Sequence, residues 1–231
     1  EQRGDIFEGI KCVFSEIQPD VILAYNHQTA GEIYEAGFSR HVVAMFRNDP
    51  DRLCPQMTDT EIQSIESADL VQVLLPSFKN SIRRYISNPR VVYIPNIIEI
   101  PDSASDIIHH KPTYKIIDVG RVNKNQKRQD LLIDAVSKSK YSDKIQLVLA
   151  GKGPKYNKYK KLGEKLVNEP VISFFDKEHL LELLGMTDLY IHSADAEIEA
   201  ISCIEAFACG IVPIIANSPK SATPQFALDD R

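Results

Sequence analysis

Short apolar runs rich in β-branched residues alternate along almost the whole chain with longer segments whose apolar residues recur at helical spacing. This alternation is typical of βαβ units, in which helices join neighbouring parallel strands. In the first half it predicts strands at 20–25, 41–46, 70–75 and 91–94, and helices at 4–17, 28–37, 59–67 and 77–86. In the second half it predicts strands at 114–119, 145–150, 171–175, 189–192 and 213–216, and helices at 127–138, 154–167, 177–185 and 203–209. We therefore expect an α/β protein with two doubly wound, Rossmann-like parallel sheets.

Prolines, serines and charged residues interrupt every period in the segment between these halves, so no long helix is expected there. We predict a first domain at 1–95, a linker at 96–113 and a second domain at 114–231. The chain begins with Glu1 rather than Met and ends soon after a predicted strand, before any helix to cover it. We expect both domains to be incomplete, the second truncated at its C-terminus, as parts of a longer protein.

A formal net charge of −5 argues against a nucleic-acid-binding protein whose affinity depends on neutralising phosphates. The 4 cysteines show no C-x-x-C spacing and no zinc motif, so reduced thiols in a cytoplasmic protein are expected. The apolar runs fall short of the ~20 residues that a membrane-spanning helix needs. We expect a cytoplasmic location, with the inner face of the membrane as an alternative.

Cationic residues gather where a predicted strand gives way to a helix in DVGRVNKNQKRQ. Gly120 and Arg121 follow the strand, and the next cations are Lys124, Lys127 and Arg128. Helix starts favour acidic residues, so cations there cost stability unless an anion lies among them. A bidentate Arg121 and the point charge of Lys127 would suit a diphosphate. A solvated basic loop explains the pattern equally well.

Gly151 and Gly153 come directly after the next predicted strand, in LAGKGP. Their small size would let the backbone turn beside a phosphate or a sugar. The third glycine of the dinucleotide fingerprint and the Lys-Ser/Thr ending of a P-loop are both missing. A plain turn between strand and helix is therefore favoured over a phosphate cradle.

Two carboxylates, Glu197 and Glu205, bracket a predicted strand-to-helix crossover, where open parallel sheets bind ligands. Glu205 also completes a capping-box pattern with Ser202, so a structural role and a ligand role explain it equally well. Glu197 lies in a predicted loop, and a solvated acid is favoured over a ligand for it. The helix is expected to end at Gly210 in a left-handed conformation. Its buried face is expected to comprise Ile204, Phe207 and Ala208.

Other polar residues give weaker signals. Asp49 and Asp51 have the D-x-D form of some metal sites, but their Asn-Asp-Pro-Asp context favours a turn. The histidines at 109–110 have no Cys, Asp or His partner at metal spacing. His27 could be catalytic or could simply begin a predicted helix.

Taken together, VGRVNKNQKRQDLLIDA, LAGKGP and an E-x7-E motif followed by EAFACG resemble the C-terminal half of GT-B-fold glycosyltransferases of family 4 (glycosyl transferases group 1). Upstream, PDVILAYN, ADLVQVLLPSFKNSI and YIPN look like the end of the N-terminal domain and its crossover, so the resemblance covers residues 19–216. It implies an acceptor domain followed by a nucleotide-sugar donor-binding domain. It also implies a retaining transfer from a UDP- or GDP-sugar to a saccharide or lipid-linked acceptor, in surface polysaccharide or glycolipid biosynthesis.

The resemblance assigns roles to the residues singled out above. Arg121 and Lys127 would bind the donor diphosphate, and Glu205 would bind the ribose hydroxyls. Glu197 would meet hydroxyls of the transferred sugar, so that Glu197, Arg121 and Lys127 form the catalytic set. The other residues expected in the donor site are Gly120, Gly151, Gly153, Ala200, Ile201 and Ser202. Such enzymes stabilise the departing diphosphate with cations and helix dipoles, so no metal and no cofactor is expected.

The sequence departs from the family pattern in several places. ANSPKSATPQ at 216–225 replaces a usual glycine pair, and Lys127 stands one residue later than usual, with Arg128 at a frequent glycine position. Arg47 stands where the N-terminal domain is expected to carry a catalytic histidine, and the glycine-rich loop that begins that domain is absent. The chain alone is therefore expected to be inactive. A catalytically silent nucleotide-binding or scaffolding module and a sugar-nucleotide epimerase remain alternatives, and the intact protein is expected to associate peripherally with a membrane.

Overall fold

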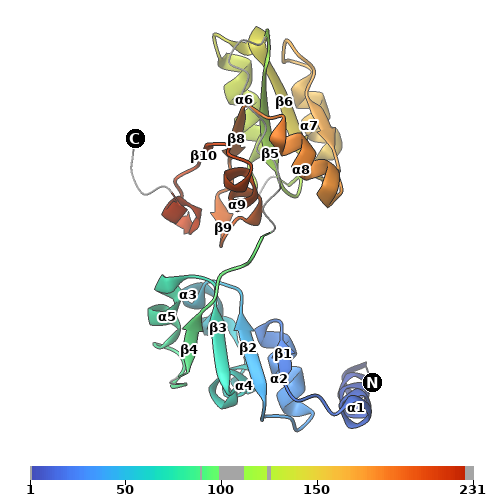
Figure 1. Ribbon diagram of the computed structural model, residues 1–231, viewed down its shortest axis with the longest axis vertical. Helices are drawn as coiled ribbons and strands as arrows, with labels where there is room; N and C mark the ends of the chain where they lie inside the picture. Colours follow the sequence, from blue (N-terminus) through green and yellow to red (C-terminus); the bar gives the residue numbers. More distant parts are fainter. Residues whose placement is uncertain (1, 89, 99–111, 124–125, 227–231) are drawn as a thin grey trace. The chain divides into compact units, whose positions relative to one another are not determined.

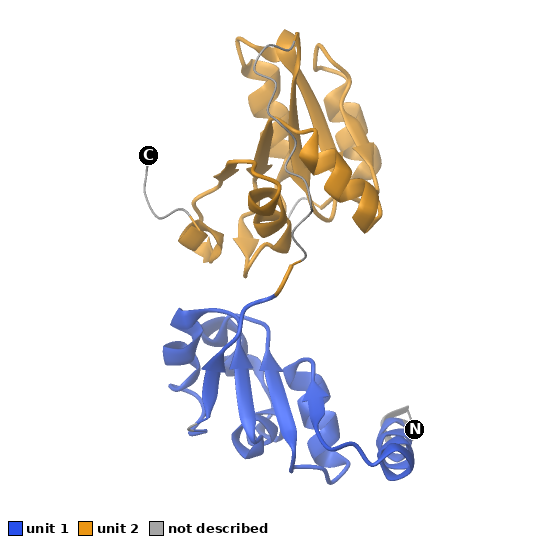
Figure 2. Ribbon diagram, in the orientation of Figure 1, with its two compact units in different colours: residues 1–96 blue, residues 97–231 orange. Residues whose placement is uncertain are grey.

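The computed structural model describes residues 2–88, 90–98, 112–123 and 126–226. The chain forms two compact units, Glu1–Asn96 and Ile97–Arg231 (Figure 2). The predicted division at 1–95, 96–113 and 114–231 stays a prediction, because most of that linker lies outside the described residues. Within the described ranges, no helix has both the length and the apolar character needed to cross a membrane.

Unit 1 is built around a four-stranded parallel sheet with the strand order β1-β2-β3-β4 (Figure 1). Its strands are β1 (Ile22–Ala24), β2 (Val42–Phe46), β3 (Leu70–Val73) and β4 (Val91–Tyr93). Its helices are α1 (Gln2–Ile17), α2 (His27–Glu35), α3 (Pro50–Leu53), α4 (Asp59–Ser67) and α5 (Pro76–Ile82), with a 3-10 turn η1 (Cys54–Gln56). Strands and helices alternate as predicted, and the neighbouring strands are parallel.

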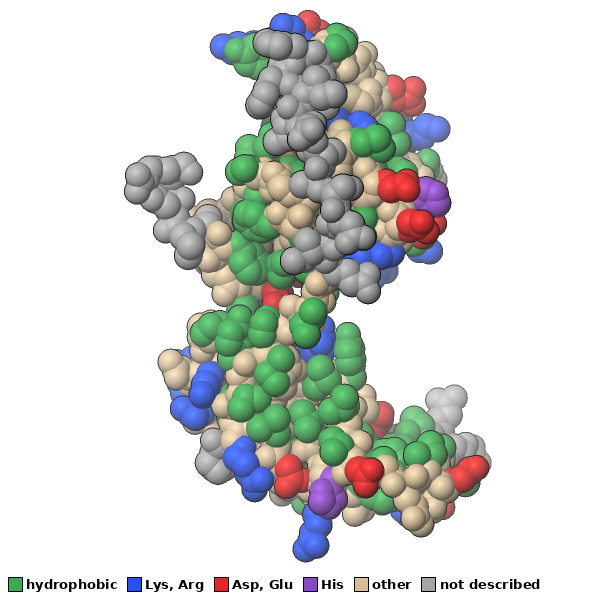
Figure 3. Space-filling view, viewed as in Figure 1, with side chains coloured by type: hydrophobic (Ala, Val, Ile, Leu, Met, Phe, Trp, Pro, Cys, Tyr) green, Lys and Arg blue, Asp and Glu red, His purple; other side chains and the backbone are tan. Residues whose placement is uncertain are grey.

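Burial alternates along β1, because successive side chains of a strand point to opposite faces of its sheet. Ile22 and Ala24 are buried, whereas Leu23 between them is exposed. Figure 3 shows hydrophobic side chains gathered over the strands of unit 1. The exposed apolar residues on these strands and at their ends include Leu23, Tyr25, Tyr93 and Ile94. The helices of the unit therefore pack on the face that carries Ile22 and Ala24.

Local signals set the helix starts in unit 1. Thr58 and Glu61 form a reciprocal capping box at the start of α4. The turn predicted at Asp49 is instead the start of α3, where the Asp49 carboxylate accepts a hydrogen bond from the Asp51 amide at 3.0 Å. The Asp51 carboxylate in turn pairs with Arg84. Both acids of the D-x-D pattern thus have structural partners.

Unit 2 is built around a five-stranded parallel sheet with the order β10-β8-β5-β6-β7. Its strands are β5 (Tyr114–Val119), β6 (Ile145–Ala150), β7 (Val171–Ser173), β8 (Leu189–His192) and β10 (Pro213–Ile215). Its helices are α6 (Gln129–Lys138), α7 (Tyr156–Gly163), α8 (Lys177–Gly185) and α9 (Ile201–Ala208), with 3-10 turns η2 (Ser142–Lys144) and η3 (Thr223–Phe226). A small parallel pair, β9 (Ala196–Glu197) with β11 (Lys220–Ser221), was not predicted.

Apolar side chains are buried on both faces of the unit 2 sheet. Ile116 and Ile117 are neighbours in β5 but belong to different clusters, since side chains alternate along a strand. The cluster of Ile116 includes Leu132 from α6, and the cluster of Ile117 includes Cys203 from α9. Helices therefore cover both faces of the sheet, and the doubly wound arrangement predicted for this half is confirmed.

The helix α9 buries a different face from the one predicted. Cys203 and Ala206 are buried, whereas Phe207 is 43% exposed. The residues predicted for the buried face were Ile204, Phe207 and Ala208. The run IEAFA offers apolar residues on several sides, so periodicity alone does not select the face. The predicted end of the helix is confirmed, because Gly210 has a φ of +74°.

The same ambiguity affects α6, whose sequence contains the adjacent apolar residues LLI. Leu132, Ile133 and Val136 are buried, whereas Leu131 is 51% exposed. Leu131 and Ala135 share the apolar run of this helix, and both are exposed. The helix is thus turned so that Ile133 faces the sheet in their place.

Candidate functional site

The strand order of unit 2 contains a point where the chain changes direction. From β5 the chain runs through β6 to β7 on one side, and it then returns to β8 and β10 on the other side (Figure 1). The loops that follow the neighbouring strands β5 and β8 therefore turn apart, which leaves the crevice where open α/β sheets bind ligands. The β5 loop carries Gly120, Arg121 and Lys127, and the β8 loop leads to Glu197.

Lys127 and Glu197 meet at this crevice. The Lys127 ammonium donates a hydrogen bond to the Glu197 carboxylate, and the two side chains are 15% and 16% exposed. The Lys127 side chain runs over Gly120, where an added Cβ would lie 3.1 Å from Lys127 Cε. Glu197 was expected in a loop as a solvated acid, but it lies in β9 and is mostly buried. That explanation is wrong, and the structure brings three of the predicted donor-site residues into contact.

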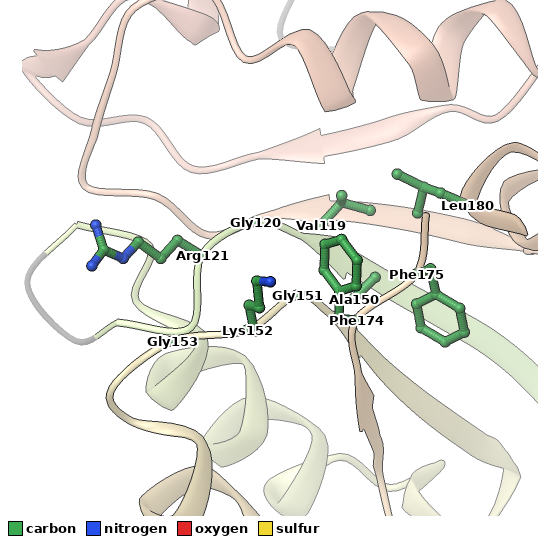
Figure 4. Close-up of a pocket in the computed structure, with 10 residues that line it drawn as sticks. All are labelled: Val119, Gly120, Arg121, Ala150, Gly151, Lys152, Gly153, Phe174, Phe175 and Leu180. Carbon is green, nitrogen blue, oxygen red and sulfur yellow. The ribbon is translucent and has the colours of Figure 1, made fainter. Parts of the chain in front are cut away.

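A cavity of about 560 Å³ opens beside the carboxyl ends of β5 and β6 (Figure 4). The predicted donor-site residues that line it are Gly120, Arg121, Gly151 and Gly153. These residues lie toward one end of the cavity, together with Lys152. The other end is formed by the apolar side chains of Phe175 and Leu180. Phe174 lies between the two ends, with the Lys152 ammonium 4.5 Å from the centroid of its ring. Arg121 is exposed and pairs with no acid of the part of the chain that the structure describes.

Gly151 and Gly153 allow two loops to pack against each other. A Cβ added to Gly151 would overlap the carbonyl oxygen of Gly120, and one added to Gly153 would overlap the carbonyl oxygen of Val122. The Val122 amide also donates a hydrogen bond to the Lys152 carbonyl at 3.1 Å. This backbone contact explains why glycines are needed at both positions. It agrees with the plain turn between strand and helix that the sequence favours. Contact of these glycines with a donor stays a prediction.

The residues before α6 hold Lys127 in place. Arg128 has a φ of +52°, a left-handed conformation that glycine adopts most readily, and this explains why glycine suits the position. The Lys127 amide donates a hydrogen bond to the Asn123 side chain at 3.0 Å, and Arg128 Nε donates one to Asp130 at 3.2 Å. Lys127 is thus not part of a solvated loop. Lys124 lies outside the described residues.

The start of α9 differs from the predicted capping box. The helix begins after Ala200, whose φ of +51° is left-handed, and no side chain caps it. Ser202 is therefore the second helical residue, and its hydroxyl lies 2.8 Å from the Tyr190 hydroxyl and 3.3 Å from the Val119 carbonyl. The capping-box interpretation is wrong. The amides of Ile201 and Ser202 lie in the first turn, where no preceding turn supplies acceptors.

Glu205 on α9 has a partner that was not predicted. Its carboxylate accepts a hydrogen bond from the ammonium of Lys177, the first residue of α8. The Glu205 side chain is 7% exposed and the Lys177 side chain 51% exposed. Reasoning from the sequence missed Lys177 because 28 positions separate the pair. The one available signal was a lysine in the first turn of a helix, where acidic residues are favoured.

A buried polar network lies beneath the β5 loop. Asp118 is 2% exposed and accepts hydrogen bonds from Ser193 Oγ at 3.0 Å and Gln129 Nε2 at 3.2 Å. Burial raises the pKa of Asp118 to about 6, although the bonds from Ser193 oppose this rise. Burial, and then the charge of Lys127, lower the pKa of His192 to about 4. A carboxylate inside the apolar strand IIDV was the sequence signal for this network.

Residues 102–225 match the family model described as glycosyl transferases group 1. The match spans more than half of the chain. The chain belongs to this family. The family resemblance inferred from the motifs is thereby confirmed, while no curated protein matches the sequence.

Solved structures extend the likeness of this group 1 chain to unit 1. Anabaena Alr3699/HepE in complex with UDP and glucose gives a TM-score of 0.72 at 14% identity, covering 97% of this chain and 64% of that chain. A single-residue mutant of S. aureus TarM in complex with Fondaparinux, alpha-GlcNAc-glycerol and UDP gives 0.71 at 15% identity, covering 96% of this chain and 46% of that chain. These likenesses confirm the predicted GT-B fold. The catalytic domain of cholesterol-alpha-glucosyltransferase from Helicobacter pylori is 50% identical over 51% of this chain and 73% of that chain, with a TM-score of 0.46.

In unit 1 of this glycosyl transferases group 1 chain, Arg47 follows β2 directly. Its guanidinium donates a hydrogen bond to Asn96 Oδ1 at 2.7 Å and lies 4.6 Å from the centroid of the Tyr25 ring. His27 is the first residue of α2, which agrees with the interpretation that it begins a helix. The histidines at 109–110 lie outside the described residues.

Proposed function

We propose that the protein is a glycosyltransferase that moves a sugar from a UDP- or GDP-sugar to a saccharide or lipid-linked acceptor. The observation that carries this proposal is the pairing of Lys127 with Glu197 over Gly120, beside a cavity at the carboxyl ends of β5 and β6. Membership of the glycosyl transferases group 1 supports the reaction class. We further propose that the anomeric configuration is retained and that no metal is needed.

The charges of the crevice suit the donor's diphosphate. Arg121 is exposed at the glycine-lined end of the cavity and presents planar N–H donors that match phosphate oxygens. Lys127 would add a point charge once a phosphate competes with Glu197 for its ammonium. The first-turn amides of α9 would add partial positive charge from the helix dipole. Together these groups would stabilise the charge that develops on the departing diphosphate.

The remaining predicted residues would position the rest of the donor. Glu197, freed from Lys127, would accept hydrogen bonds from the transferred sugar, and Glu205 would accept them from the ribose. Phe174 lines the cavity with the Lys152 ammonium 4.5 Å from its ring, and a base would stack on that ring in place of Lys152. The solved HepE and TarM structures contain UDP, which supports a uridine nucleotide as the first to test. An acceptor in surface polysaccharide or glycolipid assembly, reached from the cytoplasmic side of a membrane, completes the proposal.

A second candidate is a nucleotide-binding module without turnover. Arg47 favours it, because an arginine stays protonated and cannot exchange a proton as a histidine would. Incubation of the intact protein with UDP-glucose and an acceptor panel separates the two candidates. Nucleotide binding without transfer or donor hydrolysis would select the silent module, and conversion of the free sugar nucleotide would select an epimerase.

Titration calorimetry with UDP, GDP and their sugars tests the site. Lys127→Ala and Glu205→Ala are each expected to weaken binding tenfold or more, since a hydrogen bond to a charged group contributes ~1.5–3 kcal/mol. Lys138→Ala is the matched control, because Lys138 is 74% exposed and pairs with Asp134 one turn earlier in α6. Unchanged affinity in the two site variants would remove the assignment.

A further inference from the structure

Asp118 is a buried carboxylate that is not among the residues lining the cavity. It lies in β5, one residue before Val119, and is 2% exposed. Its Oδ2 accepts hydrogen bonds from the Ser193 amide at 3.4 Å and the Ser193 hydroxyl at 3.0 Å. Its Oδ1 accepts a hydrogen bond from Gln129 Nε2 at 3.2 Å. Asp118 thereby joins β5 to the residue after β8 and to the first turn of α6.

The same two partners also hold the backbone of the cationic residues. The Ser193 hydroxyl lies 2.8 Å from the Lys127 carbonyl oxygen, so its proton is shared between that oxygen and Asp118. Gln129 Nε2 lies 3.2 Å from the Arg121 carbonyl oxygen. Asp118 is therefore linked through Ser193 to the main chain of Lys127, and through Gln129 to the main chain of Arg121. These are the two residues that the proposed function assigns to the diphosphate.

We propose that Asp118 is a positioning residue for diphosphate binding, which through Ser193 and Gln129 fixes the main-chain positions from which Lys127 and Arg121 reach the phosphates. This inference rests on the proposed function. Asp118 itself touches no substrate. Its place in the mechanism is to hold two cations of the β5 loop at a fixed spacing, which lowers the cost of ordering them when the anion binds.

A role in the fold alone does not account for this carboxylate. Burial disfavours its charged form and raises its pKa, against the opposing charge of Lys127 and the bonds from Ser193 and Gln129. An uncharged residue would therefore suit the fold at least as well. Asp118 lowers the stability of the fold, yet it is hydrogen-bonded to Ser193 and Gln129, which hold the main chain of Lys127 and Arg121. Such an arrangement is typical of a functional site whose geometry is maintained at a cost in stability.

Variants can break each arm of the network separately. Ser193→Ala removes the link to Lys127, and Ser193→Thr keeps a hydroxyl there. In Asp118→Asn the new amide nitrogen faces Gln129 Nε2, so the Gln129 side chain must flip to offer Oε1, an atom that has no partner in the described structure. The flipped Gln129 can no longer donate to the Arg121 carbonyl. Ser137→Ala is the control, because the Ser137 hydroxyl bonds within α6, to Asp134 O at 2.7 Å.

Titration calorimetry of the chain with UDP and UMP, or with GDP and GMP if those bind, reads the effect on the second phosphate. Ser193→Ala and Asp118→Asn are each expected to weaken diphosphate binding about threefold to tenfold, the range of one or two lost hydrogen bonds. Monophosphate binding should change less than half as much on a logarithmic scale, Ser193→Thr should restore the diphosphate affinity, and Ser137→Ala should match the wild type. Thermal melting of Asp118→Asn should show a midpoint at or above that of the wild type.

The outcomes separate this inference from the function on which it rests. A wild-type chain that binds neither UDP nor GDP contradicts the proposed function. If the wild type binds a diphosphate and the variants keep that affinity, the positioning role is overturned. It is also overturned if the variants lose diphosphate and monophosphate affinity equally. A lowered melting midpoint for Asp118→Asn overturns it too, because the carboxylate would then serve the fold.

Discussion

The ammonium group of Lys127 is hydrogen-bonded to the carboxylate of Glu197, 70 positions later in the chain. Lys127 precedes α6 and Glu197 lies in β9, so the pair joins the two loops that flank the switch point of the unit 2 sheet. Both side chains are mostly buried, and each neutralises the charge of the other. A diphosphate that binds Lys127 must therefore compete with Glu197.

This competition predicts that Glu197→Gln binds UDP more tightly than the wild type. The amide no longer attracts the Lys127 ammonium by charge, and UDP lacks the sugar that Glu197 would contact. A gain of ~1 kcal/mol, or about fivefold in Kd, is expected from the loss of one partly buried ion pair. Titration calorimetry at neutral pH measures the change.

Glu164→Gln is the matched control, because this substitution removes the same charge and Glu164 is exposed at the end of α7. Its UDP affinity should stay near that of the wild type. Weaker binding by Glu197→Gln would mean that the carboxylate orients Lys127 for the phosphate and does not compete with it.

The two glycines of the β6 loop predict a loss of stability when a methyl group is added. Gly151→Ala and Gly153→Ala would each force a side-chain carbon onto a backbone carbonyl, which cannot move without shifting the β5 loop. Each change is expected to lower the free energy of unfolding by about 1–3 kcal/mol, the usual cost of overpacking. Urea unfolding followed by circular dichroism measures it.

Gly9→Ala serves as the control for this pair. Gly9 lies in α1, and an added Cβ there meets nothing within 4 Å. The change should leave stability unaltered or raise it by ~0.5–1 kcal/mol, because alanine is the better helix former. If Gly151→Ala behaved like Gly9→Ala, the close approach of the two loops would be refuted.

Four elements of unit 2 were predictable to the residue because their signals are local. The bounds of β5, β6, α8 and β8 match the predicted segments 114–119, 145–150, 177–185 and 189–192. Each is a run of apolar residues with a clear period, or a helix that begins after an acidic cap such as Asp176. The pair β9 and β11 was missed because each strand has only 2 residues, too few to show any period.

The candidate site was predictable as a set of residues but not as a set of contacts. Family motifs single out Lys127, Glu197 and Glu205, whereas the bond from Lys177 to Glu205 depends on how α8 and α9 pack. The start of α9 was misplaced because Ala200 adopts a left-handed backbone that nothing in its side chain favours. Long-range packing, which the sequence pattern does not encode, decides both features.

Lys177→Met is expected to lower stability at neutral pH. Removing the ammonium leaves the buried Glu205 carboxylate without the charge that balances it. A fully buried pair would cost about 3–5 kcal/mol to break, and because Lys177 is half exposed we expect about 1–2 kcal/mol. Urea unfolding at pH 7 measures the change.

Lys220→Met is the comparison, since Lys220 pairs with Asp195 at 3.3 Å and the two side chains are 60% and 36% exposed. Its effect should stay below about 0.5 kcal/mol. Equal losses of unfolding free energy in the two variants would show that the burial of Glu205 does not strengthen the contribution of its ion pair with Lys177.

Asp118 and His192 give stability opposite dependences on pH. The pKa of Asp118 is raised by burial from 3.8 to about 6, so between these values the folded chain holds a proton that the unfolded chain releases. Its contribution to stability therefore falls as pH rises through that window. The pKa of His192 is lowered from 6.5 to about 4, first by burial and then by Lys127, with Glu197 opposing. In that window the unfolded chain holds the proton, so the His192 contribution rises with pH.

The two windows overlap, and removing either group should expose the slope of the other. Asp118→Asn leaves the His192 slope, so the free energy of unfolding should rise by up to ~1.4 kcal/mol per pH unit as pH increases from about 4 to 6. His192→Phe leaves the Asp118 slope, so stability should fall over the same range, while the wild type changes least. Urea unfolding of the three chains at several pH values in this range measures the slopes. Parallel profiles for the two variants would show that burial does not shift these groups in opposite directions.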